Sequence, residues 1–210
     1  MSGKTTIVEE SAKVLDLPFY SKSVSVQTGT HEFFGYYDAN GHYVPTLFRK
    51  AYEEGGIFLL DEFDAGNPNV LAALNQSVAN NVCPFPDAMV PKHKDFIMVI
   101  AGNTFGTGAT MEYVGRNKID AATLDRFVFL EIPYDNKFEM NLAKDKEWCK
   151  EVQEYRKRAS DKGLKVVISP RATFYGEMLL LAGLSKEEVL KMTVFKGLTD
   201  SEADLLRGKK

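Results

Sequence analysis

Two continuous apolar runs, each followed at once by polar side chains, constrain the fold of this chain more than any other feature. Residues 57–60 (IFLL) lead into the acids of 61-DEFD-64, and residues 96–103 (FIMVIAGN) end in Asn103. Fully apolar strands are typical of a parallel sheet that is buried on both faces. The two runs therefore predict an α/β fold with a mostly parallel sheet between layers of helices.

The segments around these two runs alternate between helical and strand patterns. Further strands are expected over 19–27 and 127–132, and Asn40-Gly41 between tyrosines predicts a hairpin. Helices are expected over 4–16, 45–54, 69–81, 137–162 and 170–182 and from Ser185, with a helical turn at 120–126 and a short strand at 165–169. The composition changes after Pro133, which predicts an α/β core over 1–135 and a small helical domain over 136–210.

Charge and side-chain chemistry exclude several classes of protein. The 26 basic and 29 acidic residues give a net charge of −3, which argues against binding nucleic acid by bulk charge. The apolar runs fall far short of the roughly 18 residues that suggest a membrane span. Cys83 and Cys149 have no metal-ligand spacing and suit free thiols in a reducing cytoplasm. His31, His42 and His93 are too dispersed to suggest a metal cluster.

The first six residues, MSGKTT, match the end of a phosphate-binding loop. In that motif a glycine lets the backbone approach phosphate, a lysine neutralises its oxygens, and a hydroxyl binds Mg²⁺ at the start of a helix. Gly3, Lys4 and Thr5 would take these places, directly before the predicted helix. The motif's first glycine would lie upstream of Met1, so the alternative is an ordinary exposed terminus.

Polar residues at the ends of the two apolar runs are candidates for catalysis. Asp61 could hold the shell of a Mg²⁺ ion and Glu62 could polarise an attacking water, or the strand could simply end in a charged loop. Asn103 would lie at the same sheet edge, where ligands of open α/β sheets bind. It could position water against a γ-phosphate, although asparagine is also a common turn residue.

Two arginines could stabilise charge on a transferring phosphoryl group. Arg126 opens the last apolar run, and such an arginine often acts from a neighbouring subunit. The alternative is a local ion pair with Asp120 or Asp125. Arg171 begins a predicted helix of the second domain and could reach a nucleotide when that domain closes, or could be solvated.

Together, the ordered motifs SGKTT, IFLLDEFD, MVIAGNT, TLDRF and SPRA resemble those of AAA+ ATPases, in particular the dynein-related and MoxR-like group. The stretches DEFDAGNPNVLAALNQ and AGNTFGTGATMEYVGRNKIDAATLDRF are similar to the CobS-like ATPase subunits of aerobic cobalt chelatase. The resemblance covers essentially the whole chain. It implies a three-layer P-loop NTPase core with a helical lid, and ATP and Mg²⁺ as cofactors.

The resemblance also implies a role for each matching residue. The catalytic residues would be Glu62, Asn103 as sensor 1, and Arg126 as an arginine finger acting in trans. The nucleotide would be bound by Gly3, Lys4, Thr5, Thr6, Asp61 and Arg171, the last as sensor 2, and Mg²⁺ by Thr5 and, through water, Asp61. Arg116 lies in a loop near the family's subunit interface and receives no role. Phe33, Phe34, Tyr36 and Tyr37 could grip a partner at a central pore, or pack on their own subunit.

These roles predict a Mg²⁺-dependent ATPase that forms a ring, expected to be hexameric, and remodels a partner protein or complex. One alternative is the ATPase subunit of a cobalt chelatase, with chelatase-type subunits as partners. A second is a nucleotide-binding scaffold that does not hydrolyse ATP, which the incomplete phosphate loop favours. A third is the motor of a nucleic-acid-processing complex whose partner subunit would bind the nucleic acid.

The resemblance finally predicts that the chain is truncated at its N-terminus, within the phosphate-binding motif. Strands in the family follow the order 5-1-4-3-2, and strand 1 leads directly into the phosphate loop. Residues 19–27, 57–61, 96–102 and 127–132 would supply strands 2, 3, 4 and 5. A strand-wide gap between the last two, or their direct pairing, is therefore expected. Backbone groups left buried and unpaired there would cost about 1–3 kcal/mol each, so poor solubility is expected too.

Overall fold

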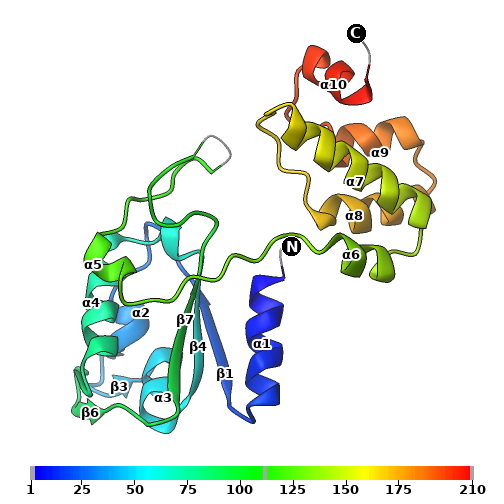
Figure 1. The fold of residues 1–210 in the computed structure, drawn as a ribbon. Helices are drawn as coiled ribbons and strands as arrows, with labels where there is room; N and C mark the ends of the chain where they lie inside the picture. The colour runs from blue at the N-terminus through cyan, green and yellow to red at the C-terminus, as the bar shows by residue number, and fades with distance from the viewer. Residues whose placement is uncertain (1–2, 111–112, 209–210) are drawn as a thin grey trace. The chain divides into compact units, whose positions relative to one another are not determined.

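The computed structural model describes residues 3–110 and 113–208, and the chain divides into two compact units (Figure 1). One unit spans Gly3–Phe129 and the other begins at Leu130. Each unit has its own hydrophobic core. No helix in the described ranges is long and apolar enough to cross a membrane.

The first unit is built on a three-stranded parallel sheet with the order β1-β4-β7. The strands are β1 (Phe19–Ser23), β4 (Gly56–Asp61) and β7 (Phe96–Ala101). Ser23 pairs with Asp61, and Asp61 with Ala101, so the three strands end level with one another. The predicted strands over 57–61 and 96–102 and the relative order of the three strands are confirmed, whereas the strand predicted over 19–27 is shorter and ends at Ser23.

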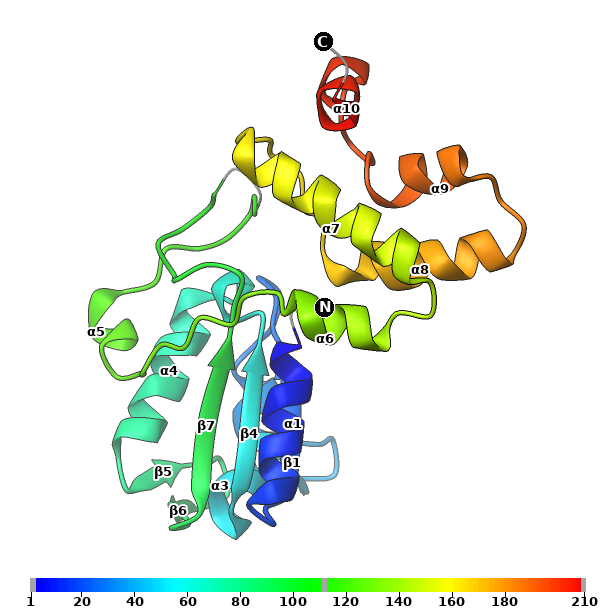
Figure 2. The same ribbon diagram turned by 45° about the vertical axis from the view of Figure 1, so that its right-hand side comes forward.

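Helices cover both faces of this sheet, as expected for an α/β fold (Figures 1 and 2). Helix α1 (Lys4–Val14) lies on one face, and α2 (His31–Phe34), α3 (Leu47–Glu54) and α4 (Pro68–Ala79) lie on the other. On the second face Phe33, Phe48 and Phe58 are fully buried, and the rings of Phe48 and Phe58 meet edge to face at 5.3 Å. The apolar strand β4 is thus buried from both sides, which explains its unbroken apolar sequence.

Two small hairpins flank the sheet. The predicted hairpin at Asn40-Gly41 is formed by β2 (Tyr36–Tyr37) and β3 (Tyr43–Val44), with Gly41 at a φ of 77° in the turn. A second hairpin, β5 (Val82–Pro84) with β6 (Met89–Pro91), was not expected. Its proline-rich sequence reads as a loop, because proline is tolerated only on edge strands.

The predicted strand over residues 127–132 is wrong. These residues follow the short helix α5 (Ala121–Leu124) without forming a ladder with any described strand, so direct pairing with β7 does not occur. Val128 is 100% exposed and Leu130 is 80% exposed. An apolar run becomes a buried strand only where a neighbouring strand and a covering layer are available. Among the described strands β7 pairs with β4 alone, so β7 is an edge rather than an interior strand.

The second unit is helical. It contains α6 (Asn136–Leu142), α7 (Lys146–Asp161), α8 (Pro170–Leu181), α9 (Lys186–Thr193) and α10 (Asp200–Arg207). Trp148 is buried in its core and donates its indole N–H to the carbonyl oxygen of Thr173 at 3.1 Å. Gly176 permits this packing, because a Cβ there would lie 2.4 Å from the Trp148 ring.

Two predictions for this unit are wrong in detail. The single helix expected over 137–162 is two helices, because the Asp145 side chain accepts a hydrogen bond from Trp148 N at 2.9 Å and starts a new helix. The strand expected over 165–169 is an irregular segment that joins no ladder among the described strands. Arg156 instead donates to the carbonyl oxygen of Ile168 at 2.6 Å.

Candidate active site

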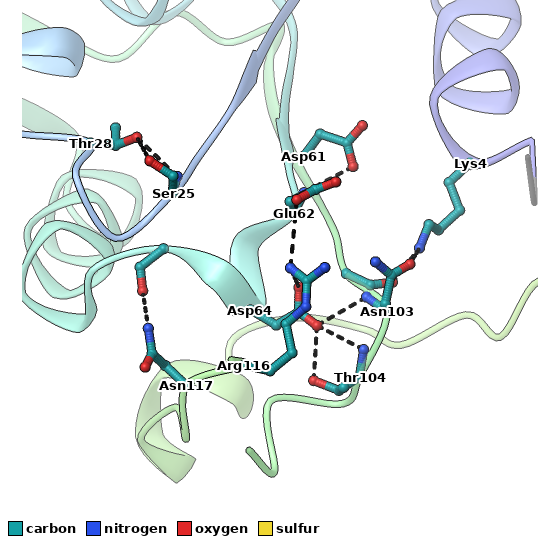
Figure 3. A network of polar contacts seen from close by, with 12 residues as sticks. Lys4, Ser25, Thr28, Asp61, Glu62, Asp64, Asn103, Thr104, Arg116 and Asn117 are labelled. Carbon is teal, nitrogen blue, oxygen red and sulfur yellow. Dashed lines mark hydrogen bonds and ion pairs between the residues drawn. The ribbon is translucent and has the colours of Figure 1, made fainter. Parts of the chain in front are cut away.

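Five residues predicted for catalysis and binding lie together at the carboxyl edge of the sheet, and Figure 3 labels four of them: Lys4, Asp61, Glu62 and Asn103. Lys4 and Thr5 open α1, Asp61 ends β4, Glu62 follows it, and Asn103 follows β7. We call Lys4, Thr5, Asp61, Glu62 and Asn103 the edge cluster. They meet because β4 and β7 end level and α1 begins beside those ends.

The Lys4 ammonium group lies against the end of β7. Its Nζ donates to Asn103 Oδ1 at 2.8 Å and to the carbonyl oxygen of Gly102. Partial burial lowers the Lys4 pKa from its ordinary value, while the nearby carboxylates of Asp61 and Asp64 oppose that shift. A lysine held in this way presents a fixed positive charge at the sheet edge, beside the strand-end carboxylates.

Thr5 and Asp61 form a second contact across the site. Thr5 Oγ1 donates to Asp61 Oδ2 at 3.0 Å, and Asp61 Oδ1 accepts from the backbone N–H of Glu62 at 2.9 Å. A hydroxyl and a carboxylate are oxygen donors of the kind that Mg²⁺ prefers. The residues present therefore fit a magnesium site between α1 and β4.

Glu62 has an unusual backbone conformation. Its φ is 55°, in the left-handed region, where a side chain other than glycine costs about 1–3 kcal/mol. The residue turns the chain from β4 into the short 3₁₀ helix η1 (Phe63–Ala65). Its side chain is 53% exposed, so the carboxylate is open to solvent at the end of the strand.

Asp64 holds groups of the site in place through hydrogen bonds, and the sequence analysis did not identify it. Its side chain is fully buried, at 0% exposure. Asp64 Oδ2 accepts from Asn103 N at 3.1 Å, from Thr104 N at 2.9 Å and from Thr104 Oγ1 at 3.0 Å. The sequence signal was the third acid of DEFD, which follows Phe63 and cannot be distinguished from a surface acid by pattern alone.

Arg116 is the second residue that the sequence left without a role. Its Nη1 lies 3.2 Å from Asp64 Oδ1 and 3.6 Å from Glu62 Oε2, and its side chain is 13% exposed. The next residue fixes the loop, because Asn117 N donates to the Asp64 carbonyl and Asn117 Nδ2 to the Gly66 carbonyl, both at 2.8 Å. Arg116 is therefore held at the edge cluster within its own chain.

The remaining predicted site residues lie beside the edge cluster or outside it. Gly3 has a φ of 77° immediately before α1, and Thr6 is exposed in the first turn of that helix. Arg126 Nη1 donates to the carbonyl oxygen of Asn75 on α4 at 3.4 Å, rather than to a member of the edge cluster. Arg171 is exposed in the first turn of α8, in the second unit.

The fold of this chain is similar to that of solved structures with which it shares little sequence. A RuvB mutant of Thermotoga maritima superposes with a TM-score of 0.54 at 18% identity, over 90% of this chain and 57% of that one. NtrX of Brucella abortus superposes with a TM-score of 0.52 at 14% identity, over 95% of this chain and 46% of that one. The α/β sheet flanked by helices matches these proteins, which is a likeness of fold.

The sequence identifies the family of this chain. Residues 2–127 match the AAA domain (dynein-related subfamily), and the chain belongs to that family. Membership supports nucleotide binding and ATPase activity in general, and AAA+ proteins typically assemble into rings.

Curated relatives are similar to part of the chain. The uncharacterized proteins SERP0979 of Staphylococcus epidermidis and SAUSA300_1302 of Staphylococcus aureus are 26% identical to this chain over 147 residues, 63% of its length. The match covers 52% of each relative, so the chain spans about half the length of these proteins.

Proposed function

We propose that this chain hydrolyses ATP in a Mg²⁺-dependent reaction at the edge cluster. The convergence of three distant segments carries the proposal. Lys4 contacts Asn103 across 99 positions of sequence, and Thr5 contacts Asp61 across 56. An ammonium group at a helix start, a hydroxyl beside a strand-end carboxylate and a neighbouring solvent-exposed carboxylate are the groups that phosphoryl transfer to water requires.

Binding would depend on α1 and β4. The Lys4 ammonium group would neutralise phosphate oxygens, and the free N–H groups at the start of α1 would point at the same anion. Thr5 and Asp61 would hold Mg²⁺, the latter through water. Bound Mg²⁺ would supply charge neutralisation at the phosphoryl oxygens. Gly3 and Thr6 would complete the contacts to the phosphates.

Catalysis would depend on the residues at the strand ends. The exposed Glu62 carboxylate would accept a proton from the attacking water, and the Asn103 amide would orient that water. The hydrogen bond of Arg126 to Asn75, outside the edge cluster, supports a role for Arg126 at the nucleotide of a neighbouring subunit. Such a role requires a ring, which we propose to be hexameric.

We propose that residues 1–135 form the nucleotide-binding core and residues 136–210 a lid whose Arg171 reaches the nucleotide on closure. The division of the chain at Phe129 supports this assignment. Hydrolysis would then remodel a partner protein or complex. The similarity of 61–76 and 101–127 to CobS-like subunits supports the alternative that this chain is the ATPase subunit of an aerobic cobalt chelatase, with chelatase-type subunits as partners. The buried free thiols of Cys83 and Cys149 support a reducing, cytoplasmic setting.

The open edge of β7 supports the proposal that a further strand belongs beside it. Among the described strands β7 pairs with β4 alone, and the curated relatives are about twice as long as the stretch they share with this chain. A preceding strand that leads into Gly3 would complete the phosphate-binding motif and cover that edge.

Lys4→Ala tests the proposed nucleotide site. The variant should lose Mg²⁺-ATP binding in isothermal titration calorimetry, measured in a chain that carries the complete phosphate loop, because no other side chain of α1 supplies this charge at the edge cluster. Lys13→Ala is the matched control, since Lys13 lies at the other end of the same helix and pairs with Glu9 and Glu10. Unchanged affinity in Lys4→Ala would refute the assignment.

A further inference from the structure

The buried carboxylate of Asp64 has no part in the reaction proposed above, yet it is the most heavily bonded side chain at the site. Its Oδ2 accepts three hydrogen bonds from Asn103 and Thr104, and its Oδ1 faces Arg116 (Figure 3). A fully buried carboxylate is stable only when its oxygens are paired. Both oxygens of Asp64 are paired, Oδ2 with Asn103 and Thr104 and Oδ1 with Arg116.

Arg116 connects this carboxylate to Glu62. The same nitrogen, Nη1, lies 3.2 Å from Asp64 Oδ1 and 3.6 Å from Glu62 Oε2. The two acceptors differ in exposure, because the Asp64 side chain is fully buried while that of Glu62 is half exposed. The buried Asp64 carboxylate therefore holds the guanidinium group, and the guanidinium group in turn contacts the exposed Glu62 carboxylate.

The charge of Arg116 also acts within the site. It is one of the groups that lower the Lys4 pKa, after burial, so the positive charge of Arg116 acts on the Lys4 ammonium group. Arg116 reaches this position because Asn117 fastens the loop to Asp64 and Gly66 through its backbone and side chain. The loop that carries Arg116 is thus attached to the turn that carries Glu62.

We propose that Arg116 is a positioning residue that orients the Glu62 carboxylate of its own subunit, and that Asp64 anchors both Arg116 and the backbone at Asn103. The inference rests on the proposed function, because it assumes that Glu62 acts on the attacking water. One buried carboxylate would then set the positions of two groups on either side of the reacting phosphate.

The variant Asp64→Asn distinguishes the two interactions of this carboxylate, one with Arg116 and one with the backbone at Asn103. An amide at position 64 keeps one oxygen for the donors of Asn103 and Thr104 but offers its NH₂ group to Arg116, which is itself a donor. The variant should therefore release Arg116 while keeping the Asn103 backbone in place. Its turnover should fall to the level of Arg116→Gln and no further.

Arg116→Gln is the decisive variant, because it leaves the buried Asp64 unchanged. We expect kcat to fall about 10–100-fold, as for other residues that orient a functional group, while KM and ATP affinity stay at the parent values. Lys118→Gln removes a cation from the same loop and should leave kcat unchanged. Equal kcat values for Arg116→Gln and the parent would overturn the inference, and so would a loss confined to KM.

Mixing subunits tests whether Arg116 acts within its own chain. An Arg116→Gln subunit combined with a Glu62→Gln subunit should show no recovery of ATPase activity, since neither chain holds both groups. Recovery would place Arg116 in trans and overturn the inference while leaving the proposed function intact. Turnover that does not depend on Glu62 in the parent protein would overturn both.

Discussion

Glu62 combines an exposed carboxylate with a strained backbone, and this pairing has a consequence for its substitution. A φ of 55° persists only where the surroundings enforce it. Here the Asp61 carboxylate accepts the Glu62 N–H at 2.9 Å, and η1 follows at once. A glutamine at position 62 can keep the same backbone, so its effect reports on the carboxylate alone.

Glu62→Gln should bind ATP but fail to hydrolyse it. The amide cannot accept a proton from water, whereas Lys4, Thr5 and Asp61 remain in place. We expect kcat to fall about 10²–10⁴-fold, the usual contribution of a general base, measured by phosphate release. Calorimetry should show unchanged ATP affinity. Glu54→Gln, at the exposed end of α3, is the control and should keep the parent's turnover. Normal turnover in Glu62→Gln would exclude Glu62 as the group that accepts a proton from water.

The residues of the site were predictable to different degrees. Lys4, Thr5, Asp61, Glu62 and Asn103 occupy positions that strand ends and a short motif define locally, so the sequence places them together. Asp64 depends on backbone amides about 40 positions further along, which no local pattern reports.

At the scale of elements, the strands inside the sheet were predictable and the segment outside it was not. Apolar runs identified β4 and β7 because those strands pack against covering helices. The run at 127–132 has the same composition but no strand beside it, and Val128 is fully exposed. An apolar segment is buried as a strand only where a neighbouring strand and covering helices are available. The sequence pattern shows only that the segment could be buried.

The helix boundary at Asp145 shows a similar limit. The charged pattern over 137–162 continues through residues 143–145, so periodicity alone predicts one helix. The structure ends α6 at Leu142 and starts α7 at Lys146, because the Asp145 carboxylate binds the Trp148 N–H and Trp148 enters the core. A capping interaction and one buried indole ring outweigh the helical periodicity.

A buried ion pair between α6 and α7 predicts how the second unit responds to pH. Burial alone would raise the pKa of Glu139, but hydrogen bonds from Arg156 and Thr173 lower it below its ordinary value. A carboxyl group whose pKa is lower in the folded state contributes stability above its unfolded pKa. This contribution is lost as the pH falls through the folded pKa.

Thermal unfolding of the parent protein should therefore show a falling melting temperature for the second unit as the pH drops below about 4, near the ordinary pKa of a glutamate. Glu139→Gln should reduce this dependence while lowering stability at neutral pH, because Arg156 would lose its charged partner. Glu147→Gln, in the exposed first turn of α7, should retain the parent's pH profile. An equal pH dependence in Glu139→Gln would contradict this account.

At the scale of the whole molecule, the family's ring architecture leads to a complementation experiment. Arg126→Ala should lose turnover because a neighbouring nucleotide loses its arginine. Mixed with Glu62→Gln subunits, it should regain some activity, since one interface between the two chains pairs an intact Glu62 with an intact Arg126. Phosphate release at several mixing ratios measures this. Parent-level hydrolysis by Arg126→Ala alone would refute the action in trans.

The open edge of β7 finally bears on how the isolated chain behaves at high concentration. An edge strand with unpaired N–H and C=O groups is a template for other chains, and the exposed apolar side chain of Val128 adds a second place at which chains can associate. Native proteins often place charged residues beside such aggregation-prone segments, which reduces association between chains. Val128→Lys should therefore lower static light scattering at high protein concentration without changing ATP affinity, whereas equal scattering would mean that self-association begins elsewhere.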